Sequence, residues 1–293
     1  MSEQKYYLPE PSYWPLVGSL GLFVTVFGFA NALPTEAGGS IGSLGMMYVG
    51  FAILVVMMFG WFGIVIRESE AGKYNSQVDT SFRMGMMWFI FSEVMFFAAF
   101  FGALFYARQL SIPWLAGEGN NLMTNELLWK GFTETWPLLN SPDAVKYPAP
   151  DNVIPADGIP LINTILLLTS SVTVTFAHHA LKKGHRGALN LWLFVTVLLG
   201  FIFVGFQAYE YIEAYQDLNL KLSSGIYGTT FFMLTGFHGL HVTIGATILT
   251  IILIRCLKGH FTPNNHFGFE AAAWYWHFVD VVWVGLFIFV YWL

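Results

Sequence analysis

Seven long apolar stretches constrain this chain of 293 residues more strongly than any other feature of its sequence. A helix of about 20 apolar residues is long enough to cross the roughly 30 Å hydrocarbon core of a bilayer. Only 11% of the residues are charged, whereas a soluble domain carries about 25%. The sequence therefore predicts an all-α membrane protein with seven transmembrane helices, over residues 15–33, 42–66, 82–106, 161–177, 188–211, 227–257 and 271–293.

A charged segment, residues 67–83, separates the first two predicted helices from the last five. We expect a single membrane domain over residues 1–293, with two sub-bundles over residues 14–66 and 82–293. The one long connection is an acidic, proline-rich outer loop over residues 107–160, in which we expect a surface helix over 120–136. Two interpretations of this loop stay open: it binds a basic partner such as cytochrome c, or it packs on a neighbouring subunit.

The basic residues are divided unevenly between the two sides of the predicted bundle. Inner segments of membrane proteins carry an excess of Lys and Arg, and an inner N-terminus puts most of the 13 basic residues on that side. These inner residues are Lys5, Arg67, Lys73, Arg83, Lys182, Lys183, Arg186, Arg255 and Lys258. The alternative that the first stretch is a cleaved signal peptide fits less well, because its apolar run is longer than usual.

Other classes of protein are excluded by simple counts. A single cysteine, Cys256, excludes a disulfide framework and any cysteine-based zinc or iron–sulfur site. The net charge of −5 gives no indication of a nucleic-acid partner.

Glu93 is the most conspicuous ionisable residue within a predicted helix. It follows the start of its span by 11 residues, which at 1.5 Å per residue is roughly 17 Å, close to the middle of the bilayer. A charge at this depth costs several kcal/mol, so we expect the carboxyl group to be neutral. It acts either as a proton-relay group or as a hydrogen-bonding group between helices.

Four more ionisable residues lie near the middle of predicted helices: His238, His241, His277 and Asp280. The first two are three residues apart, as are the last two, so each pair shares a helix face. The histidines could ligate haem, and His277 with Asp280 could form a transport site. We favour packing contacts between helices and predict no metal site, because no Cys or Glu is spaced to complete a ligand shell. Gln207, Glu210 and Glu213 are expected at the outer membrane interface.

Six short sequences occur in a specific order along the chain. They are FIFSEVMFF (89–97), AHHAL (177–181), QAYEYIEA (207–214), GIYGTTFF (225–232), GFHGLH (236–241) and HFGFEAAAWYWHFVDVVW (266–283). Together they closely resemble subunit III of haem–copper cytochrome c oxidases, and the similarity extends over roughly residues 10–293. The resemblance implies two N-terminal helices splayed from a five-helix bundle by a lipid-filled cleft.

The resemblance also implies a function. It indicates a non-redox, non-catalytic subunit of a proton-translocating oxidoreductase in the respiratory chain, with subunits I and II and structural phospholipid as partners. Haem and copper would be bound by the partner subunits, and cytochrome c would be the substrate of the complex. The chain would stabilise subunit I and support proton uptake while oxygen is reduced to water.

Individual residues match positions of that family. Glu93 matches an intramembrane carboxylate, and Arg67, Glu68, Arg255, Lys258 and His260 match positions that contact lipid headgroups. Lys73 and Tyr74 stand where the family often has a histidine, so the headgroup contacts at that point are expected to differ.

The long outer loop and the lack of a targeting presequence favour a bacterial plasma membrane over the mitochondrial inner membrane, with a cytoplasmic N-terminus and a periplasmic C-terminus. Two other functions stay open. One is subunit III of a related quinol oxidase, which usually lacks the first two helices. The other is a stand-alone transporter or haem protein, although no inverted repeat is visible.

Overall fold

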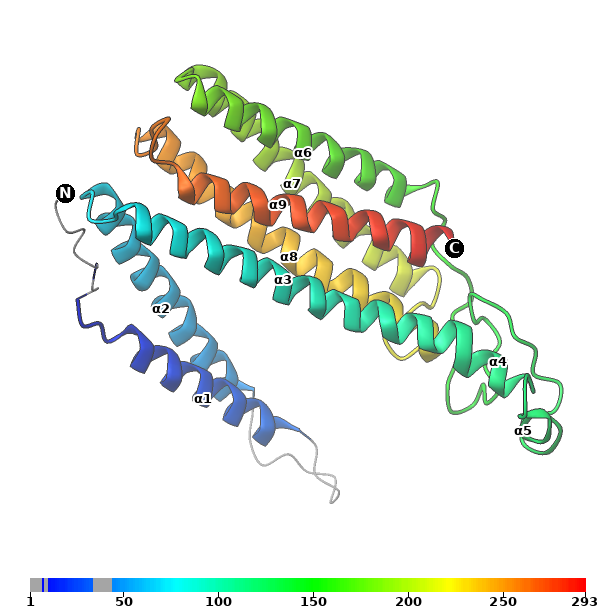
Figure 1. Cartoon of the computed structure of the whole chain (residues 1–293). Coiled ribbons are helices and arrows are strands. Elements are labelled where there is room, and N and C mark those ends of the chain that lie inside the picture. The colour runs from blue at the N-terminus through cyan, green and yellow to red at the C-terminus, as the bar shows by residue number, and fades with distance from the viewer. Residues whose placement is uncertain (1–6, 8–9, 34–43) are drawn as a thin grey trace. The chain divides into compact units, whose positions relative to one another are not determined.

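The computed structural model describes residue 7, residues 10–33 and residues 44–293. It is built from helices (Figure 1), and the described residues contain no β-strand. The long helices are α1 (Trp14–Ala32), α2 (Gly45–Glu70), α3 (Ser76–Tyr106), α6 (Ile159–Lys182), α7 (Arg186–Gln216), α8 (Gly225–Leu257) and α9 (Phe267–Leu286). Two short helices, α4 (Ile112–Leu115) and α5 (Leu122–Leu127), and two π-helical segments, η1 (Ala107–Ser111) and η2 (Phe287–Trp292), complete the set.

Among the described residues, seven helices are long and apolar enough to cross a membrane, which confirms the all-α, seven-helix prediction. Most of them extend beyond the predicted apolar stretches. The third continues through η1 and α4 to Leu115, and α2 continues to Glu70. Hydropathy marks the part of a helix that lies in hydrocarbon, whereas backbone hydrogen bonding continues into the headgroup region. Residues 42 and 43 of the second predicted stretch lie outside the described residues.

The chain forms two compact units, residues 1–82 and residues 83–293. In the first unit α1 packs along α2, and glycine allows the close approach: a Cβ atom at Gly28 would overlap the backbone of Met47, and one at Gly50 would overlap that of Thr25. Both helices leave most of their apolar side chains exposed, as expected for surfaces that contact lipid. The predictions of a single domain and of a lipid-filled cleft stay predictions.

The second unit is organised around α9. In an apolar stretch of 18 residues within its span, 61% of the residues are buried. The corresponding share is 33–39% for α6, α7 and α8, so α9 is the central helix. It packs on both α6 and α8, between which it runs in Figure 1. The Trp276 ring fills the space left by two glycines, since a Cβ atom at Gly200 or Gly245 would lie 2.7 or 2.8 Å from it.

The outer loop contains less helix than predicted. Only α5 forms within residues 120–136. The Asn125 side-chain amide donates to the backbone oxygens of Trp129 and Phe132, and Gly131 adopts a φ of 84°, so the chain turns there instead of continuing as a helix. Leu138 and Ile154 are buried and anchor the rest of the loop to the hydrophobic core.

Candidate functional site

Glu93 on α3 contacts His241 on α8, although 148 residues separate them in the sequence. The carboxylate oxygen Oε2 lies 2.9 Å from the imidazole Nε2. The other nitrogen of the ring, Nδ1, lies 2.6 Å from the backbone oxygen of Phe237, one turn earlier on α8. Both nitrogens of His241 therefore have a partner within the second unit.

These contacts fix the number of protons that the pair can hold. A carbonyl oxygen only accepts hydrogen bonds, so Nδ1 of His241 must carry a proton and donate it to Phe237. The contact between Nε2 and Oε2 then needs one proton. Either Glu93 is neutral and donates to a neutral imidazole, or an imidazolium donates to the Glu93 carboxylate. In both states the pair has no net charge, which suits its position within the bilayer.

Aromatic rings surround the pair. The rings of Phe97 and Phe96 lie 5.0 and 6.0 Å from that of His241, and Tyr275 stacks on it at 6.4 Å. The side chains of His241 and Glu93 are 11% and 23% exposed. The carboxyl group is thus shielded but still partly exposed at the surface of the unit.

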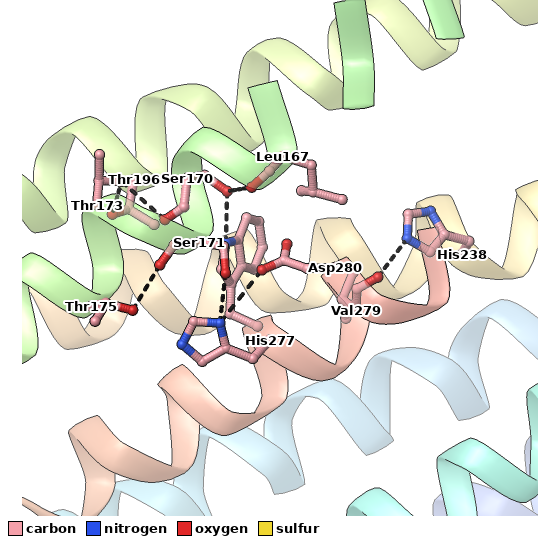
Figure 2. Close-up of polar contacts among 11 residues, drawn as sticks. Leu167, Ser170, Ser171, Thr173, Thr175, Thr196, His238, His277, Val279 and Asp280 are labelled. Carbon is pink, nitrogen blue, oxygen red and sulfur yellow. Dashed lines mark hydrogen bonds and ion pairs between the residues drawn. The ribbon is translucent and has the colours of Figure 1, made fainter. Parts of the chain in front are cut away.

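His238 lies on the same helix as His241 but contacts a different neighbour. It is fully buried, and its Nε2 donates to the backbone oxygen of Val279 on α9 at 3.1 Å (Figure 2). Its ring lies against Trp283, with 5.0 Å between centroids. The structure therefore does not bring His238 and His241 together as a pair of ligands, because each joins α8 to a different helix.

His277 and Asp280 lie one turn apart on α9, as their spacing predicts (Figure 2). The Nδ1 atom of His277 lies 3.6 Å from Asp280 Oδ2 and only 2.7 Å from the Ser171 hydroxyl of α6. Asp280 is buried, whereas the His277 side chain is 40% exposed. Ser171 was missed in the sequence, because nothing in its local pattern distinguishes it from other serines within helices.

Hydrogen bonds between side chains join the same helices at further levels. Trp276 donates from Nε1 to the Ser170 hydroxyl at 2.9 Å, and Trp283 donates to Thr164 at the same distance. Thr173 and Thr196 join α6 to α7 at 2.8 Å. Small hydroxyl residues of this kind hold helices together where lipid provides no hydrophobic driving force.

Glu210 and Gln207 are buried within the second unit, and their expected depth at the outer membrane interface stays a prediction. Oε1 of Glu210 accepts hydrogen bonds from Gln207 at 3.1 Å and from the Tyr291 hydroxyl at 2.6 Å. The hydrogen bond from Tyr291 could not be predicted from the sequence of α7 alone, because Tyr291 lies near the C-terminus of the chain.

In the first unit, Arg67 and Glu68 lie in the last turn of α2. Arg67 donates to the backbone oxygen of Gly63 at 3.2 Å, and Glu68 accepts a hydrogen bond of 2.9 Å from the Tyr74 hydroxyl. Burial and this hydrogen bond raise the pKa of Tyr74 above its ordinary value. Tyr74 thus makes Glu68 part of the turn that follows α2.

In the second unit, Arg255, Lys258 and His260 follow one another at the end of α8. The guanidinium group of Arg255 stacks over the Phe261 ring at 4.3 Å from its centroid. Lys258 caps the helix through its backbone nitrogen, and His260 donates its backbone N–H to the Arg255 carbonyl oxygen. The end of α8 therefore presents two permanent positive charges close together.

A further cluster lies where α6 ends and α9 begins. His178, His266 and Glu270 bring one potential ligand atom each to within 4.8 Å of one another, and they are the one group of three such residues in the described part of the chain. Arg83 forms an ion pair with Glu270. The sequence prediction of no metal site did not consider this set, because His178 is far from the other two in the chain.

A family model described as cytochrome c oxidase subunit III matches residues 4–117 and 144–293. The chain belongs to the cytochrome c oxidase subunit III family. Proteins named cytochrome c oxidase subunit 3 from Latimeria chalumnae and Dugong dugon are each 40% identical to it over 290 residues, and that from Pongo abelii is 41% identical. Each alignment covers 98% of this chain and 96% of the relative. The recognition of the family from its motifs is confirmed.

The prediction of a bacterial plasma membrane is wrong, because these relatives of subunit III are vertebrate proteins. They favour the mitochondrial inner membrane, which the sequence ranked second. The prediction had relied on a long outer loop. The family model omits residues 118–143 of this loop while matching both sides of it. Surface loops change length with little effect on a fold, so loop length does not identify the membrane.

Proposed function

We propose that this chain is the non-redox subunit III of a haem–copper cytochrome c oxidase. In this proposal it stabilises subunit I, binds structural phospholipid and supports proton uptake during the reduction of oxygen to water. Haem and copper are bound by the partner subunits, and none of the residues of this chain is catalytic. The proposal extends the family assignment to a specific role.

The hydrogen bonds of His241 support a non-redox role for this residue. Both of its ring nitrogens have partners within the second unit. An axial haem ligand needs a free imidazole nitrogen that faces the iron. Ligation by His241 would require the contact with Glu93 to break, which disfavours His241 as a haem ligand.

The observation that carries the proposal of a protein partner is the exposed His277. Its side chain is 40% exposed although it lies within the span of α9, and it bonds to Ser171 on α6. Polar groups within a membrane face other protein groups or a water-filled cavity rather than lipid. We assign this face of α6 and α9 to the contact with subunit I.

A cross-linking experiment tests that contact. Val281 lies one turn after His277 and is 72% exposed, whereas Leu191 on α7 is 59% exposed. A photo-reactive amino acid at position 281 should cross-link to subunit I, and the matched variant at position 191 should not. Cross-linking of subunit I from position 191 alone would refute the assignment.

The lipid role rests on the end of α8. Basic residues close to the inner membrane surface attract anionic headgroups, by about 1 kcal/mol for each charge. Arg255→Ala should therefore reduce the anionic lipid retained by the purified complex about fivefold without loss of haem. Lys146→Ala, on the outer loop, serves as the matched control. Equal lipid content in the Arg255→Ala variant and the wild type would contradict this part of the proposal.

Purification through a tag on this chain tests the function as a whole. Haem absorbance and two larger subunits should co-purify, and the complex should oxidise cytochrome c. Oxidation of a quinol but not of cytochrome c would instead support the quinol oxidase alternative. A chain that purifies alone would support a transporter if it is colourless and a haem protein if it is coloured.

A further inference from the structure

The cluster formed by His178, His266 and Glu270 has the chemistry of a metal site. Nε2 of His266 lies 3.2 Å from Oε1 of Glu270, and Nε2 of His178 lies 3.4 Å from the same oxygen. Both nitrogens are buried, and neither makes a hydrogen bond of good geometry. Three potential ligand atoms thus lie close together, and the two nitrogens form no hydrogen bond with the carboxylate oxygen.

The second nitrogen of His266 explains why this convergence is unusual. Nδ1 lies 3.1 Å from the backbone oxygen of Thr262, and because a carbonyl only accepts, Nδ1 must carry the proton. In the neutral ring Nε2 is then a bare lone pair that faces the lone pairs of Glu270 Oε1. Two acceptors repel each other at this distance unless a proton or another cation lies between them. Metal-binding histidines are commonly fixed in this way, by donation of the other N–H to a backbone carbonyl.

We propose that His178, His266 and Glu270 bind a divalent transition-metal cation, with Zn²⁺ as the expected occupant. Zinc binds His nitrogen and carboxylate oxygen at about 2.0–2.2 Å, which places neighbouring ligand atoms of a tetrahedral site about 3.3–3.6 Å apart. The contacts of 3.2 and 3.4 Å to Glu270 Oε1 are close to this separation. Two imidazoles and one carboxylate with no thiolate also suit zinc or Fe²⁺ better than Mg²⁺ or Ca²⁺.

The burial of the cluster suits a bound cation. The side chains of His178, His266 and Glu270 are 24%, 10% and 12% exposed. A site with this exposure excludes most water but can still exchange a cation with solution. The three protein ligands leave a fourth position for water. The cation would join the end of α6 to the start of α9, and this inference does not depend on the proposed function.

Arg83 provides an internal test of the assignment. Its guanidinium group pairs with Oε2 of Glu270, the carboxylate oxygen that does not face the histidines, and lies over the Phe267 ring at 5.3 Å from its centroid. A positive charge at this place repels a metal cation and competes for the carboxylate. Neutralising Arg83 should therefore strengthen metal binding, whereas it would weaken an arrangement in which Arg83 and Glu270 serve only as an ion pair.

The experiment uses the purified complex that contains this chain, dialysed first against a chelator. Equilibrium dialysis with radioactive zinc compares the wild type with His266→Gln, Glu270→Gln and Arg83→Gln. His179→Gln is the matched control, because His179 is the adjacent, exposed histidine of α6 and lies outside the cluster. The haem spectrum and the subunit gel verify that each variant is assembled.

We expect the wild type and His179→Gln to bind one more zinc ion per complex than His266→Gln and Glu270→Gln, with at least about tenfold weaker binding in those two variants. Arg83→Gln should bind zinc more tightly than the wild type. X-ray absorption at the zinc edge should show a shell of nitrogen and oxygen without sulfur. Equal zinc binding by the wild type and His266→Gln, weaker binding by Arg83→Gln, or a sulfur shell would overturn the proposal.

Discussion

The contact between Glu93 and His241 allows a sharp test, because one substitution at this contact should keep the hydrogen bond and another should remove it. In Glu93→Gln, the amide N–H can donate to Nε2 of His241, whose Nδ1 proton is already directed to Phe237. The hydrogen bond is kept, so the stability of the second unit should change little. In His241→Phe the aromatic contacts are kept, but the Glu93 carboxyl group loses its partner.

The size of the second effect follows from the structure. Removing one partner of a buried hydrogen bond leaves the other group without a partner, at a cost of about 1–3 kcal/mol. Glu93 is 23% exposed, and part of that free energy is recovered by other contacts, so we expect a loss of about 1–2 kcal/mol. In a small fraction of molecules α8 has separated from its neighbours. At 1.4 kcal/mol for each factor of ten, this fraction should rise by about five- to thirtyfold.

Cys256 reports this population directly. It is the single cysteine of the chain, it lies on α8 with His241, and it is 2% exposed. A thiol reagent reaches it only when α8 separates from its neighbours, and mass spectrometry of the peptide measures its alkylation within the complex. Alkylation should accelerate in His241→Phe and not in Glu93→Gln. Equal acceleration in both variants would refute the proposed direction of the hydrogen bond.

Infrared spectroscopy tests the proton count of the pair. We expect a neutral Glu93 at pH 7, because a neutral pair avoids separated charges within the bilayer. The difference spectrum between the wild type and Glu93→Gln should contain the band of a protonated carboxyl group. A carboxylate band accompanied by a neutral imidazole would leave no proton in the contact and would contradict the structural argument.

Three further predictions concern packing, hydrogen bonding and pH. Gly245→Ala should destabilise the second unit by about 1–3 kcal/mol, because its Cβ atom would lie 2.8 Å from the Trp276 ring. Gly205→Ala is the control, because the space around Gly205 is open. The rate of Cys256 alkylation measures the effect of both substitutions. Ser170→Ala leaves the indole N–H of Trp276 without its acceptor and should cost about 0.6 kcal/mol by the same assay, so an effect above that of Gly245→Ala would contradict this value. On the outer loop, desolvation and the neighbouring Glu118 raise the pKa of Glu134 above its ordinary value, so the folded loop binds this proton more tightly than the unfolded loop does. The resulting stabilisation is present below the ordinary glutamate pKa and is lost as the pH rises through the folded value. Trypsin cleavage at Lys130 in the wild type, relative to Glu134→Gln at the same pH, should therefore increase as the pH rises, and a constant ratio would refute the shift.

The number of membrane-spanning helices could be predicted from the sequence because it depends on a sum over many residues. About 20 apolar residues in a row predict a span whatever their neighbours are. Helix ends depend on single residues, and for this reason α2 and α3 extend beyond the predicted stretches. The prediction of a surface helix over 120–136 was wrong for the same reason. The side chain of Asn125 and the positive φ of Gly131 turn the chain after α5.

The contacts of the candidate site could be predicted only in part. Spacing placed His277 and Asp280 on one face, and the structure agrees, because that contact lies within a single helix. His238 and His241 have the same spacing but bond to different helices. Three residues correspond to about 300° of rotation, so the two side chains point about 60° apart, which is enough to reach separate neighbours. Which helix lies on each side is not encoded in the local sequence.

The attachment of α3 shows why the polar contacts matter for the second unit. Of the 31 residues of α3, only Phe97 and Leu104 are buried, so apolar packing holds this helix weakly compared with α9. Arg83 and Glu93 join it to α9 and α8, and they are ten residues, or about 15 Å, apart along its axis. Two polar contacts at different depths fix both the position and the tilt of a helix, which one contact cannot do. Loss of the hydrogen bond at Glu93 should therefore leave α3 with one of these two polar contacts, that of Arg83, beside its aromatic packing. The effects of Glu93 variants on a respiratory complex would then include displacement of α3 as well as any change in proton transfer. The Glu93→Gln variant separates the two, because it keeps the hydrogen bond and removes only the acidic proton.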